Sequence, residues 1–162
     1  MHLFPILQVM ALLKLANVTP LFAKKIFRQF CARPLDGGIK FFDGRPLFGS
    51  SKTIRGIVLS ILITAAGAPL IGLDLSVGFT AATAAMAGDL FSSFIKRRLN
   101  FPPSSQAPGL DQIPESLLPL LACRAALSLT IFDIALGVGV FFIAEIVLSR
   151  ILYRAHLRDE PY

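Results

Sequence analysis

The chain has 162 residues, of which 54% are hydrophobic and only 16% are charged, and its formal net charge is +6. Soluble domains carry about 25% charged residues, so this chain has too little charge to cover its apolar surface in water. The same composition excludes an intrinsically disordered chain, because disorder goes with low hydrophobicity. The two cysteines have no metal-ligand spacing, which argues against a disulfide framework and a zinc site.

Apolar segments that can cross a bilayer follow one another along the chain. A membrane-spanning helix needs about 20 apolar residues. The first such segment is interpreted as a retained span rather than a signal peptide, because Lys14 interrupts it and no cleavage motif follows. The sequence predicts an all-α, polytopic membrane protein that forms a single catalytic domain over residues 1–162. Its five predicted transmembrane helices are residues 3–23, 57–73, 75–95, 113–132 and 135–153.

The division of the last apolar block into two helices depends on where the chain turns. Asp133, Gly137 and Gly139 interrupt the apolar pattern, and such residues mark turns. The sequence therefore predicts a tight turn near residues 133–139.

The basic residues indicate the orientation of these spans. Of the 16 basic residues, 14 lie in the segment after the first span, in the segment after the third span, or near the C-terminus. Positive residues mark cytoplasmic segments, so the N-terminus is predicted outside and the C-terminus inside the cell. The cytoplasmic loops are then residues 24–56 and 96–112, and they are expected to carry the active site. No nucleic-acid motif accompanies the basic residues, and no nucleic-acid partner is expected.

An aspartate within the third span is the first candidate for chemistry. Asp89 lies about 9 Å below the cytoplasmic end of that span, too deep for its short side chain to reach the surface. Ser92, Ser93 and Lys96 follow at spacings that place them on the same helix face. A carboxylate below hydroxyl groups and a cation suits a metal ion that carries a polyphosphate. The alternative is a purely structural ion pair between Asp89 and a buried arginine such as Arg124.

The two predicted cytoplasmic loops add further charged groups. The first loop ends with Lys52, Thr53 and Arg55, where two cations meet the start of a helix and can bind an anion. The second loop begins with three consecutive cations and ends near Asp111, a second carboxylate at the same membrane face. Carboxylates surrounded by cations are the groups that phosphoryl or nucleotidyl transfer needs.

With these motifs, the sequence resembles the CDP-archaeol synthases, small archaeal membrane enzymes that are similar to bacterial phosphatidate cytidylyltransferases. The resemblance covers nearly the whole chain. It rests on four segments: Leu15-Ala-Asn17, Asp43-Gly-Arg with Gly49-x-x-Lys52-Thr-x-Arg55-Gly56, Gly88-Asp89-Leu-x-x-Ser93-x-x-Lys96-Arg97-Arg98, and Pro108-x-x-Asp111-Gln112.

The resemblance implies Mg²⁺-dependent transfer of a cytidylyl group from CTP to an isoprenoid glycerol phosphate in the membrane. The products would be CDP-archaeol, a phospholipid precursor, and pyrophosphate. It further implies that Asp89 and Asp111 hold the metal and act in catalysis with Lys96. CTP and the lipid phosphate are expected to contact Lys52, Arg55, Arg97, Arg45, Thr53, Ser93 and Asn17.

Two alternatives stay open at this point. One is an enzyme of the CDP-alcohol phosphotransferase type, and the other is a small transporter or scaffold subunit without enzymatic activity. The roles of Arg124, Asp133 and Glu145 also stay open, because each can form a structural pair or line a lipid path.

Overall fold

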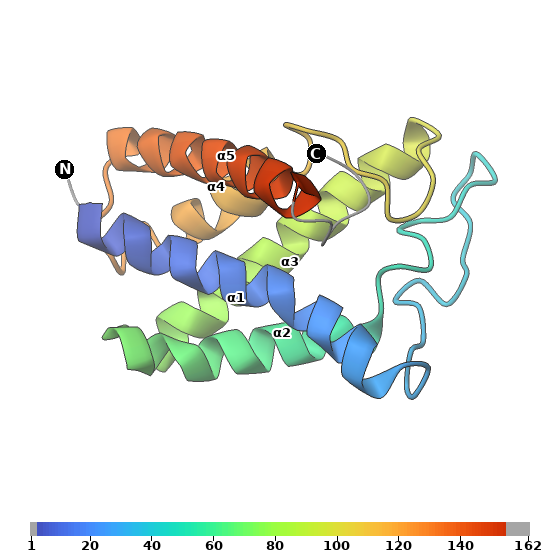
Figure 1. Ribbon diagram of the computed structural model, residues 1–162, viewed down its shortest axis with the longest axis horizontal. Coiled ribbons are helices and arrows are strands. Elements are labelled where there is room, and N and C mark those ends of the chain that lie inside the picture. Colours follow the sequence, from blue (N-terminus) through green and yellow to red (C-terminus); the bar gives the residue numbers. More distant parts are fainter. Residues whose placement is uncertain (1–2, 155–162) are drawn as a thin grey trace.

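Helices make up all the regular elements of the described residues. The computed structural model describes residues 3–154, with side chains up to residue 148, and the predicted cytoplasmic tail after residue 154 lies outside this range. In chain order the elements are α1 (Leu3–Phe27), α2 (Ile54–Gly67), the 3₁₀ helix η1 (Ala68–Ile71), α3 (Leu75–Arg98), α4 (Gln112–Ala122) and α5 (Ile131–Arg154) (Figure 1). The predicted all-α fold is confirmed.

α2 and η1 begin and end close to the bounds predicted from the sequence, because a capping residue and a glycine mark their two ends. Thr53 is the N-cap residue of α2, and its side-chain oxygen accepts a hydrogen bond from the N–H of Gly56 at 3.2 Å. At the other end, η1 stops at Gly72, whose φ of 79° is the left-handed conformation that glycine adopts readily. The predicted segments 57–73 and 75–95 correspond to α2 with η1 and to α3.

The last apolar block turns earlier than the sequence predicts. Residues 123–130 separate α4 from α5, so the predicted turn at residues 133–139 is wrong. Thr130 and Asp133 instead form a capping box that starts α5. The Asp133 carboxylate accepts hydrogen bonds from the N–H and the hydroxyl of Thr130, at 3.1 and 2.8 Å. The N–H of Asp133 donates to Thr130 Oγ1 at 3.1 Å.

The fourth apolar segment is a short helix followed by a turn, and not one helix over residues 113–132. α4 has 11 residues and is about 16 Å long, about half of the hydrocarbon thickness of a bilayer. Gly137 lies inside α5, where a Cβ atom would come within 2.8 Å of Leu120 Cδ1 on α4. The glycine therefore permits close contact between the two helices and does not break α5, which begins at Ile131 rather than at residue 135.

Small residues bring α2 and α3 together, while larger apolar residues fill the centre of the bundle. A Cβ atom at Gly78 of α3 would lie 3.0 Å from Ala65 Cα of α2 and 2.5 Å from Ala68 Cβ of η1, so these backbones approach closely. The core joins α1, α3, α4 and α5 through side chains that are almost fully buried: Ile6, Val9, Leu13, Ala16, Ala85, Met86, Leu120, Ile134 and Phe141.

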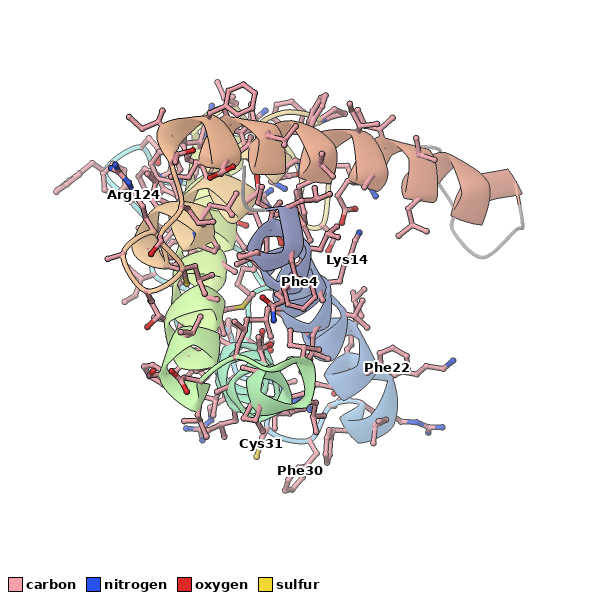
Figure 2. All side chains as sticks on the ribbon, turned by 90° about the vertical axis from the view of Figure 1, so that its left-hand side faces the viewer. Phe4, Lys14, Phe22, Phe30, Cys31 and Arg124 are labelled. Atoms are coloured by element: carbon pink, nitrogen blue, oxygen red, sulfur yellow. The ribbon has the colours of Figure 1, made fainter. Side chains whose placement is uncertain are left out.

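The outer faces of the bundle are apolar, as contact with lipid requires. Three segments of the described chain are long and apolar enough to cross a membrane: Leu3–Phe27, Ile54–Ile71 and Ile131–Leu148. Figure 2 shows side chains that point away from the bundle, among them Phe22 of α1, which is 58% exposed. An exposed apolar surface of this extent is typical of a helical membrane protein.

Both long loops lie at the same end of the bundle. Residues 28–53 connect α1 to α2, residues 99–111 connect α3 to α4, and Figure 1 shows the two loops side by side. The loop end is therefore where the charged groups of both loops can meet the last turns of α3.

Candidate active site

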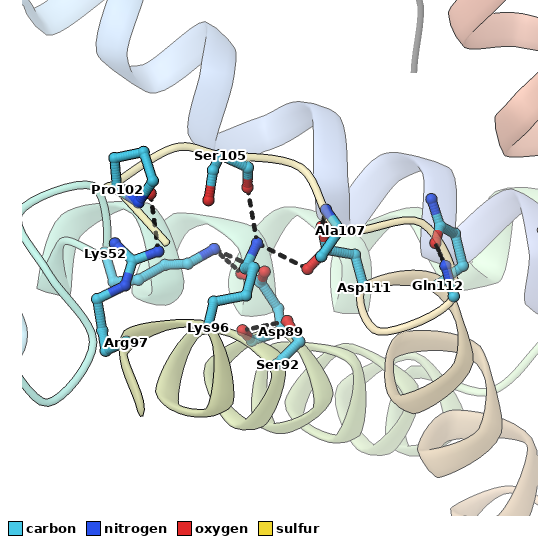
Figure 3. Close-up of polar contacts among 11 residues, drawn as sticks. Lys52, Asp89, Ser92, Lys96, Arg97, Pro102, Ser105, Ala107, Asp111 and Gln112 are labelled. Atoms are coloured by element: carbon cyan, nitrogen blue, oxygen red, sulfur yellow. Dashed lines mark hydrogen bonds and ion pairs between the residues drawn. The ribbon is translucent and has the colours of Figure 1, made fainter. Parts of the chain in front are cut away.

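An ion pair between the first loop and α3 lies at the centre of the site. Lys52 directly precedes the N-cap of α2, and its Nζ lies 2.6 Å from Oδ1 and 2.5 Å from Oδ2 of Asp89 on α3 (Figure 3). The Lys52 side chain is 21% exposed and that of Asp89 is 30% exposed, so water reaches both groups. The alternative pairing of Asp89 with Arg124 is wrong, because Arg124 lies in the turn after α4 and binds the Leu129 carbonyl.

A second ion pair lies two helical turns further along α3. Lys96 Nζ lies 2.7 Å from Oδ1 of Asp111 and donates a hydrogen bond to the Ser105 carbonyl at 2.9 Å. The other oxygen of Asp111, Oδ2, accepts a hydrogen bond from the N–H of Ala107 at 2.8 Å. These contacts fold the second loop over the end of α3, as Figure 3 shows. The structure thus brings together the two carboxylates that the sequence singled out, each with a lysine.

Close approach of α3 and α4 positions the second carboxylate. A Cβ atom at Gly88 would lie 2.4 Å from the Pro114 carbonyl oxygen, a distance that no side chain tolerates. Gly88 immediately precedes Asp89, and Pro114 is in the first turn of α4. The glycine therefore sets the distance between Asp89 and the start of α4.

The sequence analysis missed a third carboxylate of the site. Glu115, in the first turn of α4, interacts electrostatically with Asp89, Asp111 and Lys52. It follows Asp111 by four residues, the spacing of one helix face, and this spacing is the signal that could have found it. A third carboxyl group therefore lies within electrostatic range of the two predicted ones.

An arginine beside the ion pairs has unused hydrogen-bond donors. Arg97 is only 4% exposed and donates from Nη2 to the Pro102 carbonyl at 2.9 Å. Its Nε and Nη1 are buried and have no hydrogen-bond partner among the described residues. Nη1 lies against Gly49, where an added Cβ atom would be 3.2 Å away. Buried donors without partners are costly, so this guanidinium is suited to bind an anion.

Other predicted site residues hold the loops in place. Arg45 donates to the carbonyl of Arg98 at the end of α3, and this tethers the first loop. Thr53 is the N-cap of α2, as described above. Arg55 binds the carbonyls of Phe30 and Arg28 after α1, so the structure does not bring it to the two ion pairs.

The two remaining predicted residues lie on helices. Ser93 is buried on α3, one helical turn beyond Asp89, and Asn17 is partly buried on α1. Neither forms one of the ion pairs described above.

A buried aspartate organises the loop that carries Lys52, and the sequence analysis gave it no role. The Asp36 carboxylate is 6% exposed and accepts hydrogen bonds from the N–H groups of Gly38, Phe48 and Gly49, each at 3.0 Å. Burial raises the pKa of Asp36, but these hydrogen bonds together outweigh it and lower the pKa below the ordinary value. Ionised Asp36 therefore holds both ends of the first loop together.

The carboxylate oxygens of the site are of the kind that Mg²⁺ prefers. Among the described residues, no three metal-ligating side chains form a ready-made metal group. Mg²⁺ is usually held by one or two carboxylates together with substrate phosphates and water, so Asp89 and Asp111 fit that pattern. Oδ1 of Asp111 contacts the Lys96 ammonium at 2.7 Å, so Mg²⁺ at this oxygen would take the place of that lysine.

Paired carboxylates and lysines at the loop end of an apolar helical bundle are typical of a membrane-embedded enzyme. Comparison with known proteins agrees with this class. The sequence model of the CarS-like CDP-archaeol synthase family matches residues 69–162. The chain belongs to the CDP-archaeol synthase family, as the sequence motifs predict.

Relatives and a solved structure extend this result over most of the chain. The CDP-archaeol synthase of Pyrobaculum calidifontis is 35% identical over 91% of this chain and 90% of its own length. That of Pyrococcus furiosus is 44% identical over 49% of this chain, and the match spans about half (53%) of that relative's length. A solved structure, described as an intramembrane enzyme for archaeal membrane lipids biosynthesis, superposes with a TM-score of 0.72 at 28% identity. The match covers 88% of this chain and 90% of that one.

Proposed function

We propose that this protein transfers a cytidylyl group from CTP to an isoprenoid glycerol phosphate, giving CDP-archaeol and pyrophosphate. Membership of the CDP-archaeol synthase family supports this reaction. The observation that carries it is the juxtaposition of the Lys52–Asp89 and Lys96–Asp111 pairs at the loop end of apolar helices. A water-soluble triphosphate and a membrane lipid can meet at such a place.

The reaction requires few protein groups that take part covalently. A phosphate oxygen of the lipid attacks the α-phosphorus of CTP, the bond from that phosphorus to the bridging oxygen of the β-phosphate breaks, and pyrophosphate leaves. The lipid phosphate is already an anion at neutral pH, so no protein base has to remove a proton. The protein has to bring two anions together and stabilise the charge of the transition state.

The cations of the site are placed for this task. Lys52 and Lys96 bring positive charge from two different elements, and the unpartnered donors of Arg97 supply planar hydrogen bonding to a phosphate. Mg²⁺, when bound, would neutralise phosphate charge and polarise the reacting phosphoryl group. Asp89 and Asp111 would hold it, and each would then release its lysine to the substrate phosphates.

The topology of the chain follows from the positions of the basic residues. We place the N-terminus outside and both long loops in the cytoplasm, where CTP is found. α1, α2 with η1, α3 and α5 cross the membrane, and α4 with the turn at residues 123–130 makes the remaining crossing, the fourth in chain order. Within that turn Cys123 and Leu129 are buried, whereas Arg124 and Ser128 are exposed.

The native cysteines offer a test of this topology. Cys31 is exposed in the first loop and Cys123 is buried. A maleimide that cannot cross membranes should label Cys31 in inverted vesicles but not in right-side-out vesicles. A cysteine introduced at Ser128, in the opposite turn, should show the reverse, and labelling of both from one side would refute the topology.

The activity is tested with purified protein in detergent. The protein, CTP, Mg²⁺ and a geranylgeranyl glycerol phosphate should release pyrophosphate and form a lipid-linked CMP group in equal amounts. Release of CMP from a CDP-lipid instead would indicate the phosphotransferase alternative. No turnover with any lipid phosphate, in protein that is monodisperse and binds CTP, would refute the proposal.

A further inference from the structure

A lysine and a glutamate pair within the apolar part of the bundle, apart from the two ion pairs of the site. Lys14 lies near the middle of α1, about 16 Å from its start, and Glu145 lies near the middle of α5. Their side chains form an ion pair across the α1–α5 contact. Charged groups at this depth are expensive in a membrane and usually line a polar path or serve a function.

The lysine is held from one side by α5. Lys14 Nζ lies 5.6 Å from the centre of the Phe141 ring, which is one helical turn before Glu145 and is 1% exposed. Yet the Lys14 side chain is 34% exposed and the Glu145 side chain 22% exposed. The pair is therefore accessible from the outer surface of the bundle and is not sealed in its core.

The two helices separate on the loop side of this pair. Figure 2 shows the second half of α5 extending away from the other helices, with Lys14 in the angle between α5 and α1. Apolar side chains from both helices are exposed beyond the pair: Val18, Leu21 and Phe22 on α1, and Val147 and Leu148 on α5. The angle between the helices thus has apolar walls and a charged pair at its inner end, which matches the apolar chains and anionic head of a lipid phosphate.

The charged pair is also linked to the active site. Glu145 interacts electrostatically with Glu115, which in turn interacts with Asp89, Asp111 and Lys52. Glu115 is thus within electrostatic range both of Glu145 and of the charged groups of the active site.

We propose that the contact between α1 and α5 is the lateral entrance for the lipid substrate, with Lys14 as the residue that binds the lipid phosphate on entry. Glu145 competes with the phosphate for Lys14, and the Lys14–Glu145 ion pair opens when the phosphate binds. The phosphate then moves from Lys14 toward Lys52 and Lys96, while the isoprenoid chains stay between α1 and α5. This inference rests on the proposed function, because it assigns the path of that reaction's lipid substrate.

The two members of the pair should respond in opposite directions. Lys14→Met removes the phosphate ligand and should raise the KM for the lipid phosphate about tenfold, the effect of losing one hydrogen bond to a charged group. Glu145→Gln removes the competitor and should leave that KM unchanged or lower it. Neither variant should change the KM for CTP more than about twofold, and Lys14→Arg should restore the lipid KM. The matched control is Lys25→Met, on the same helix, which should have the wild-type KM for both substrates.

A structural brace would give a different pattern. If the pair only holds α1 against α5, both substitutions should lower thermal stability and impair both substrates alike. Thermal unfolding is followed with a thiol-reactive dye at buried Cys123 in a Cys31→Ser background, and each variant is measured this way. An equal rise of the lipid KM in Lys14→Met and Glu145→Gln, or a rise in the KM for CTP, would overturn the proposal that lipid enters between α1 and α5. Absence of turnover in the wild-type protein would instead overturn the proposed function, so the two failures are distinguishable.

Discussion

The Lys52 ammonium lies within 2.6 Å of both carboxylate oxygens of Asp89, so a lysine of the first loop closes over a carboxylate of α3. Each group neutralises the other at a depth where a single charge is costly. Neither side chain is fully buried, so both remain accessible to a substrate that exchanges partners with them.

Substitution of either partner should abolish turnover. Asp89→Asn and Lys52→Met should each lower kcat at least about 100-fold, the typical cost of removing one electrostatic contact in a transition state. Pyrophosphate release measures the rate, and an unchanged thermal unfolding transition verifies that each variant is folded. Lys40→Met, in the exposed part of the same loop, is the control and should retain full activity. Near-normal turnover in Asp89→Asn would remove this residue from the reaction.

Glu115, which the sequence analysis missed, should influence how much Mg²⁺ the enzyme needs for activity. Glu115→Gln replaces the carboxyl group near Asp89 and Asp111 by an amide of the same size, which cannot ionise to support a bound metal. We expect the Mg²⁺ concentration for half-maximal activity to rise about tenfold, as for groups that support metal ligands. A titration of activity with Mg²⁺ at saturating CTP measures this. An unchanged Mg²⁺ dependence would show that Glu115 does not act on the metal.

The close contact between α3 and α4 predicts a strong effect of one methyl group. Gly88→Ala would place a Cβ atom 2.4 Å from the Pro114 carbonyl oxygen, and the helices must move apart. Overpacking of this kind costs about 1–3 kcal/mol and would also displace Asp111 from Asp89. We expect a lower melting temperature and a large loss of activity. The control is Gly139→Ala on α5, where no atom lies within 4 Å of the added Cβ, and which should retain wild-type behaviour.

The first loop should loosen in acid because of Asp36. Hydrogen bonds lower the pKa of the folded Asp36 carboxyl below its ordinary value of about 3.9. A lowered folded pKa means that the stabilisation is fully present above the unfolded pKa and is lost as the pH falls through the folded one. Proteolytic cleavage within residues 28–53 should therefore increase sharply below about pH 4.

Asp36→Asn provides the comparison for this pH effect. The amide has one acceptor oxygen in place of two, so the loop should be cleaved readily even at neutral pH. Asp74→Asn, at the start of α3, is the control, since the Asp74 side chain caps no backbone group. If Asp36→Asn and the wild-type protein were cleaved alike at pH 7, the carboxylate would not be what organises the loop.

Much of the architecture and of the chemistry could be predicted from local patterns. Apolar runs of sufficient length predict the helices, because lipid contact and burial impose the same composition on every face. Asp89, Lys52, Lys96 and Asp111 stand out in the sequence because charged residues are rare and conspicuous in such a chain. The family also follows from these motifs, and comparison with known proteins confirmed it.

Other features depend on contacts between segments that are distant in the sequence. The predicted position of the turn in the last apolar block is wrong. Asp133 and Gly137 are residue types that are common in turns, and the sequence does not show that here they serve other purposes. Asp133 instead caps α5, and Gly137 admits Leu120. Likewise, Arg55 and Lys52 are three residues apart, yet one binds carbonyls after α1 and the other reaches α3.

The sequence by itself determined that this is an apolar, helical membrane protein with a small set of charged residues in and beside its apolar segments. Composition and periodicity suffice for that, since each depends only on neighbouring residues. The tertiary structure decided which cation meets which carboxylate, that Glu115 joins them, and that Lys14 reaches Glu145 across α1 and α5. The physical reason is that ion pairs act over a few ångströms, and only packing brings such distant residues within that range.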